Sequence, residues 1–99
     1  MAIYTITRVT GTTEAGSRLT DKEMEEFRRK RDDLCASVGG KAVSAYKSFT
    51  GKGNIVIYSY PSLEAAEKVR MGLWTRSGMN LIRYWTYEQD ILYEMPLNT

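Results

Sequence analysis

Two arginines occupy positions where the surrounding pattern calls for an apolar residue. Arg31 and Arg70 each follow an apolar or small residue by four positions and precede a leucine by three. At about 100° per residue, both side chains fall near the middle of the apolar stripe of a predicted helix. A guanidinium group there needs a counter-charge, a route to water or an anionic ligand. The two segments read Met24-x-x-Phe27-x-x-x-Arg31-x-x-Leu34-Cys35 and Leu63-x-x-Ala66-x-x-x-Arg70-x-x-Leu73-Trp74.

Two interpretations of these arginines stay open at this level. In the functional one, Arg31 and Arg70 hold a carboxylate, phenolate or phosphate group, because the guanidinium fork suits such anions. In the structural one, each side chain reaches the rim of the domain or pairs with a protein carboxylate such as Glu88, Asp90 or Glu94.

Aromatic side chains are the second set with binding potential. The chain has seven tyrosines among 99 residues. A tyrosine joins an apolar ring to a polar hydroxyl, so such residues line pockets for flat ligands or fill cores and dimer interfaces. We assign Tyr46, Tyr58 and Trp85, together with Arg31 and Arg70, to a candidate ligand-binding site.

The composition excludes several kinds of chemistry. There is no histidine, which removes the commonest general base and the commonest transition-metal ligand. The single cysteine, Cys35, excludes an internal disulfide and lies on the predicted apolar stripe. We therefore predict neither a metal nor another cofactor, and catalytic residues stay unassigned.

Charge and hydropathy bear on partners and location. The net charge of +2 is too small to favour nucleic acid as a partner. The chain begins without the features of a signal peptide, and no apolar run approaches the ~20 residues needed to cross a bilayer. We expect a cytoplasmic protein that does not contact membranes.

The elements that must position these residues follow the order β-α-β-β-α-β. Strands are expected at 2–10, 41–49, 54–60 and from about 80, with a further short strand or arm at 91–93. Helices are expected from a capping box at 20–23 to about 38, and from about 62 to 76. Residues 11–17 are expected to form a polar loop, with or without a role as a lid.

This order predicts one α+β domain over residues 1–99 with a ferredoxin-like arrangement: a four-stranded antiparallel sheet with both helices on one face. The strands after the first helix carry apolar side chains on both faces. A sheet face left bare by the helices would then be a large exposed apolar patch. A homodimer that packs sheet on sheet would cover it.

The chain resembles the dimeric α+β-barrel superfamily at the level of topology. The stretch most similar to that group is the joint from the third strand to the second helix, Tyr58-Ser59-Tyr60-Pro61-Ser62-Leu63-Glu64-Ala65-Ala66-Glu67. In these families small-molecule sites often lie between the sheet and the helices of each protomer. The resemblance implies a small-molecule-binding protein, either a cofactor-independent monooxygenase or an isomerase acting on an aromatic or anionic compound. The chain lacks the histidine that many enzymatic members use.

Two alternatives belong to other classes. The first is a non-enzymatic interaction module with a filled core. The second is an RNA binder, because RNA-recognition domains share this element order and stack bases on aromatic residues of the third strand. Here Lys52 and Gly53 fit that motif, but Asn54 and Val56 stand at the two stacking positions. RNA binding is therefore the less favoured alternative.

Overall fold

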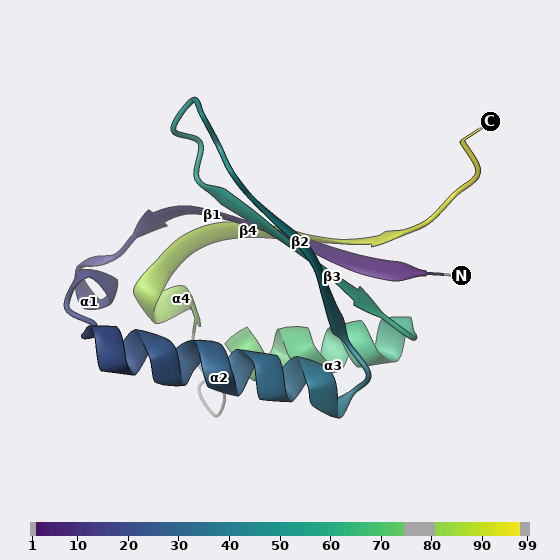
Figure 1. The fold of residues 1–99 in the computed structure, drawn as a ribbon, viewed down its shortest axis with the longest axis horizontal. Helices are drawn as coiled ribbons and strands as arrows, with labels where there is room; N and C mark the ends of the chain where they lie inside the picture. Colours follow the sequence, from purple (N-terminus) through teal and green to yellow (C-terminus); the bar gives the residue numbers. More distant parts are fainter. Residues whose placement is uncertain (1, 75–80, 98–99) are drawn as a thin grey trace.

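The computed structural model describes residues 2–74 and 81–97, and it contains one antiparallel sheet with helices packed on one side (Figure 1). The elements are β1 (Ile3–Thr12), α1 (Glu14–Ser17), α2 (Asp21–Ser37), β2 (Lys41–Lys47), β3 (Asn54–Tyr60), α3 (Leu63–Trp74), α4 (Leu81–Tyr84) and β4 (Trp85–Tyr93).

The strand order is β2-β3-β1-β4, and all three neighbouring pairs are antiparallel. The two long helices, α2 and α3, lie along the same face of the sheet (Figure 1). This combination confirms the predicted α+β class and fits a ferredoxin-like fold. The predicted start and end of β3 are also confirmed.

The start of α2 agrees with the sequence pattern. The Thr20 hydroxyl accepts a hydrogen bond from the Glu23 backbone N–H at 3.2 Å, and the Thr20 backbone N–H donates to Glu23 Oε1 at 3.1 Å. Both halves of the capping box are therefore formed.

Replacing Thr20 with alanine is expected to lower the free energy of unfolding by about 1 kcal/mol, because it leaves a backbone N–H of the first turn without its partner. Urea denaturation followed by circular dichroism measures this loss. Lys22→Ala, at an exposed position of the same turn, serves as the control and should change stability by less than about 0.5 kcal/mol. Equal losses in the two variants would contradict a role for the cap.

Two predicted segments differ from the structure. Residues 81–84 form the short helix α4 instead of opening a strand, and residues 91–93 continue β4 instead of forming a separate one. A short apolar run does not distinguish a helix from a strand by its pattern alone. The predicted end of the second helix at Arg76 and the predicted strand start at Asn80 lie outside the described residues.

The segment predicted as a polar loop is also mostly ordered as regular elements. β1 runs through Gly11, where its register with β4 shifts, and ends with Thr12 opposite Trp85. Thr13 then caps α1: its hydroxyl accepts from the Gly16 backbone N–H at 3.1 Å and donates to the Arg83 carbonyl. The prediction of a loop over residues 11–17 was therefore wrong, because a threonine cap ties this segment to α4.

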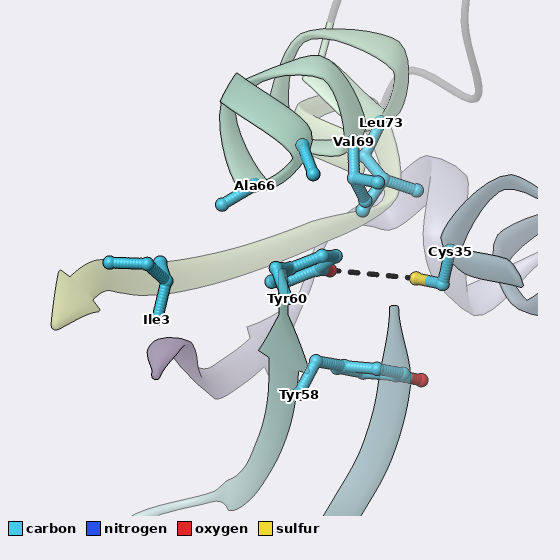
Figure 2. Packing of buried hydrophobic residues seen from close by; sticks show 8 residues of the cluster. Ile3, Cys35, Tyr58, Tyr60, Ala66, Val69 and Leu73 are labelled. Atoms are coloured by element: carbon cyan, nitrogen blue, oxygen red, sulfur yellow. Dashed lines mark hydrogen bonds between the residues drawn. The ribbon is translucent and has the colours of Figure 1, made fainter. Parts of the chain in front are cut away.

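The core lies between the sheet and the helices (Figure 2). Tyr58 and Tyr60 of β3 reach toward the helices, and Ala65 and Ala66 allow α3 to approach the sheet closely. The buried hydrophobic residues are Ile3, Cys35, Tyr58, Tyr60, Ala65, Ala66, Val69 and Leu73. No helix within residues 2–74 or 81–97 is long and apolar enough to cross a bilayer.

Candidate functional site

A cavity of about 240 Å³ lies between the helices and the sheet. The sheet contributes residues from β1, β3 and β4, and the helices contribute mainly from α2. The lining residues are Thr5, Thr7, Val9, Asn54, Val56, Tyr58, Tyr60, Trp85 and Gln89 from the sheet, and Met24, Phe27, Arg28, Arg31, Cys35, Leu73 and Leu81 from the helices.

Three of the five candidate residues meet in this cavity: Arg31, Tyr58 and Trp85. The Arg31 side chain is 31% exposed, and its guanidinium carbon lies 5.9 Å from the centre of the Tyr58 ring. Arg31 Nη2 lies 3.2 Å from Asp32 Oδ1, a carboxylate of its own helix rather than one of the three considered from the sequence. Arg31 is thus positioned at the cavity with part of its charge open to water.

Tyr46 does not line the cavity, which corrects its assignment to the site. Its side chain is 60% exposed, and it pairs with Ile55 on the face of the sheet away from the helices. The cause is a register shift between Ala42 and Ser44. An extra residue at Val43 reverses the in-and-out alternation of every following residue, and so turns Tyr46 to the other side.

Arg70 is also absent from the cavity lining, which corrects the second assignment. Its Nη1 lies 3.4 Å from Glu67 Oε2 on the preceding turn of α3, and its side chain is 39% exposed. The core-facing side of α3 is formed by Ala66, Val69 and Leu73. The sequence repeat therefore predicts two similar helices, but it does not predict two equivalent arginines.

A buried polar group that the sequence did not reveal lies along one wall of the cavity. Cys35 Sγ lies 3.6 Å from the Tyr60 hydroxyl (Figure 2), and Thr5, which is 2% exposed, lines the same cavity. Burial raises the pKa of the Cys35 thiol and of the Tyr60 phenol above their ordinary values. Both groups therefore stay protonated at neutral pH. They act as hydrogen-bonding groups and not as a thiolate or phenolate.

Gln89 is the second residue missed, because it falls between the strand predicted from about 80 and the short strand or arm predicted at 91–93. Its Nε2 donates to the Thr7 hydroxyl at 2.8 Å. Its Oε1 is buried and accepts no hydrogen bond from the residues that the structure describes. Thr7 and Gln89 are register partners, so both project from the sheet into the same cavity. The alternation of β4 would have found Gln89 if the strand had been placed correctly.

Aromatic rings line the cavity near α4. The rings of Phe27 and Trp85 meet edge to face with centres 4.9 Å apart, and Tyr84 contacts both rings. Such contacts hold large flat side chains in defined orientations. This end of the cavity offers ring surfaces, whereas the Arg31 end offers positive charge.

The buried hydroxyls and thiol predict lower stability at alkaline pH. Burial raises the pKa of Tyr87 to about 12, and it also raises those of Cys35, Tyr58 and Tyr60 above 9.0 for the thiol and 10.0 for the phenols. Because the folded pKa exceeds the unfolded one, the folded state binds more protons at high pH. The stability that these groups contribute is fully present at a pH below their pKa values in the unfolded state. It is lost as the pH rises toward and through their higher pKa values in the folded state.

We expect the urea midpoint of unfolding to fall as pH rises from about 8 to about 11. Tyr60→Phe removes one of the responsible groups and should make this fall shallower. Tyr46→Phe, which changes an exposed tyrosine on the other sheet face, is the matched control and should keep the slope of the parent protein. A midpoint independent of pH over this range would show that these groups ionise without cost in the folded state.

Comparison with known proteins bears on the fold alone. No protein-family model matches the chain, and no curated protein matches it significantly. The chain is similar to the crystal structure of methylated RPA0582 protein, with a TM-score of 0.67 and 14% identity over 99% of this chain and 84% of that chain. Together with the strand order β2-β3-β1-β4, this likeness identifies the chain as an α+β protein with a ferredoxin-like fold.

Proposed function

We propose that the protein binds a small, flat, anionic compound in the cavity between its sheet and its helices. The observation that carries the proposal is the charge of the cavity wall. Arg28 and Arg31 are its two charged lining residues among the described part of the chain, and both are cationic. An anion with an apolar body fits a wall that combines guanidinium groups with aromatic rings.

The size of the cavity further limits which ligands can fit. A volume of about 240 Å³ is smaller than the pockets that hold drug-sized molecules. The aromatic end formed by Phe27 and Trp85 suits a ring, and the Arg31 end suits a carboxylate. Aromatic carboxylates with one or two rings are therefore the ligand class best supported.

Catalysis in this cavity is a second proposal, limited to isomerisation or oxygenation of an easily ionised compound. The protonated Tyr60 hydroxyl and the Arg31 guanidinium favour it, because both stabilise negative charge on a substrate oxygen. Among the described lining residues there is no carboxylate or histidine to act as general base. A substrate would have to arrive already ionised or lose its proton to water, and for this reason binding is the primary proposal.

Calorimetric titration with matched acids and amides tests the proposal. We expect 2-naphthoate to bind at least about tenfold more tightly than 2-naphthamide, which has the same rings without the charge. Added salt should weaken the binding of 2-naphthoate more than that of 2-naphthamide, because part of the Arg31 charge is open to solvent. Equal affinity for the acid and the amide, or no binding of either at millimolar concentration, would contradict the proposal.

We also propose that two copies pair through the sheet face that the helices leave bare. From the register, this face presents Tyr4, Ile6, Ile55, Ile57 and Leu92, with Arg8 beside Glu88. The β2–β3 hairpin, which carries the fully exposed Phe49, rises on this side of the sheet (Figure 1). A second copy covers such a surface with apolar groups and offers both signs of charge to its partner.

Light scattering after gel filtration tests the pairing, with a dimer expected at micromolar concentration. Ile57→Lys, at the centre of the bare face, should produce monomers, whereas Lys68→Ala on the exposed side of α3 should not. A monomeric parent protein would contradict the proposal. RNA binding has less support, because the two stacking positions of the RNA-recognition motif hold the non-aromatic residues Asn54 and Val56, and both line the cavity and not the bare face.

A further inference from the structure

The side-chain amide of Gln89 offers the cavity a second polar group besides the arginines proposed to bind the anion. One of its two polar atoms is held by Thr7, and the other, Oε1, is buried without a hydrogen bond from the described residues. A buried carbonyl oxygen left without a donor costs about 1–3 kcal/mol. A ligand that supplies a donor to this oxygen recovers that free energy on binding.

The position of Gln89 sets where on the ligand the donor must lie. Arg31 stands over Tyr58 of β3, and Gln89 belongs to β4. These two strands flank β1, and Tyr58 pairs with Thr5 whereas Gln89 pairs with Thr7, two residues further along β1. The backbones of Tyr58 and Gln89 are therefore separated by two strand spacings across the sheet and two residues along it, about 12 Å in all. The anionic group and the donor must therefore lie at opposite ends of a ring and not on neighbouring ring atoms.

We infer that the ligand is an aromatic acid that carries a hydroxyl or amino group across the ring from its carboxylate, and that Gln89 Oε1 accepts a hydrogen bond from this group. The inference rests on the proposed function, because it assumes that the carboxylate binds at Arg31. Gln89 then acts as a specificity-determining residue. It rejects acids of the same shape that leave its carbonyl oxygen unpaired.

Calorimetric titration with 4-hydroxybenzoate and 4-methoxybenzoate tests the inference. The two acids share the ring and the carboxylate, but only the first has a donor at the far end. We expect 4-hydroxybenzoate to bind about tenfold more tightly. Its affinity should also be higher than that of 2-hydroxybenzoate, whose hydroxyl lies next to the carboxylate.

Variants of β4 show whether Gln89 causes the preference. Gln89→Leu should bring the affinities for the 4-hydroxy and 4-methoxy acids to within about twofold of each other. Glu88→Gln, one position away and directed to the other face, should keep the preference. A thermal melt of each variant shows that the fold is retained.

Three results would overturn the inference. Equal binding of the 4-hydroxy and 4-methoxy acids would show that Gln89 is satisfied by water, and tighter binding of the methoxy acid would show that its amide presents N–H to the ligand. In both cases binding that depends on Arg31 would leave the proposed function intact. No binding of any aromatic acid would overturn the inference and the proposed function together.

Discussion

Replacing Arg31 with methionine is expected to weaken the binding of an aromatic carboxylate by about 10- to 100-fold. Methionine keeps most of the length and apolar surface of the side chain but removes the charge and the hydrogen-bonding fork. Hydrogen bonds to charged groups contribute about 1.5–3 kcal/mol. Because 31% of the Arg31 side chain is exposed, water screens part of the interaction and the loss should fall near the lower limit.

The second arginine of the sequence repeat provides the matched control. Arg70 occupies the equivalent position of α3 but pairs with Glu67 and does not line the cavity. Arg70→Met should therefore leave the affinity within about twofold of the parent protein. Arg31→Lys keeps the charge without the fork and should bind with intermediate affinity. Equal effects of Arg31→Met and Arg70→Met in the titration would argue against a site at Arg31.

Gly53→Ala is expected to have the largest effect on stability, about 3–5 kcal/mol. Its φ of 91° is unfavourable for a residue with a side chain, and an added Cβ would lie 2.0 Å from the backbone oxygen of Val9. That oxygen belongs to β1 and cannot move away without disturbing the pairing of β1 with β3. A small domain has only about 5–15 kcal/mol of stability, so this loss is a large share of it.

Gly51→Ala separates the backbone strain from the steric clash. Gly51 lies in the same hairpin with a φ of 77°, but an added Cβ there would meet no atom within 4 Å. Its loss should be about 1 kcal/mol, from backbone strain alone. Urea denaturation followed by circular dichroism compares the two variants. Similar losses at both positions would show that β1 and the hairpin do not approach as closely as described.

The fold was predictable because its signals are local and agree with one another. The capping box at Thr20, the glycines after α2 and the apolar run of β3 each mark an element, and their order permits few topologies. The start of β4 was not predictable in this way. Leu81 to Trp85 is compatible with either a helix or a strand, and the choice of helix involves the contact of α4 with Thr13, far away in the sequence.

The candidate site was predictable only in part, for an equally physical reason. Arg31, Tyr58 and Trp85 were identified because their helix and strand positions direct them to the same layer. Tyr46 was misplaced because one extra residue at Val43 reverses the alternation of β2, and the sequence has no clear signal for such a bulge. Gln89 was missed because the predicted strands left it out, although it is the register partner of Thr7 at the cavity. Thr5 was missed because a threonine on a strand is normally exposed.

Mapping of a bound aromatic acid by NMR tests the binding site most directly. Titration of the ¹⁵N-labelled protein with 4-hydroxybenzoate should shift the indole N–H of Trp85, the side-chain amide of Gln89 and the guanidinium signals of Arg31, which line one cavity. The backbone signals of Ile6 and Tyr46, whose side chains lie on the bare face of the sheet, should change far less. Shifts confined to that bare face, or no shifts at saturating acid, would contradict a ligand site between the sheet and the helices.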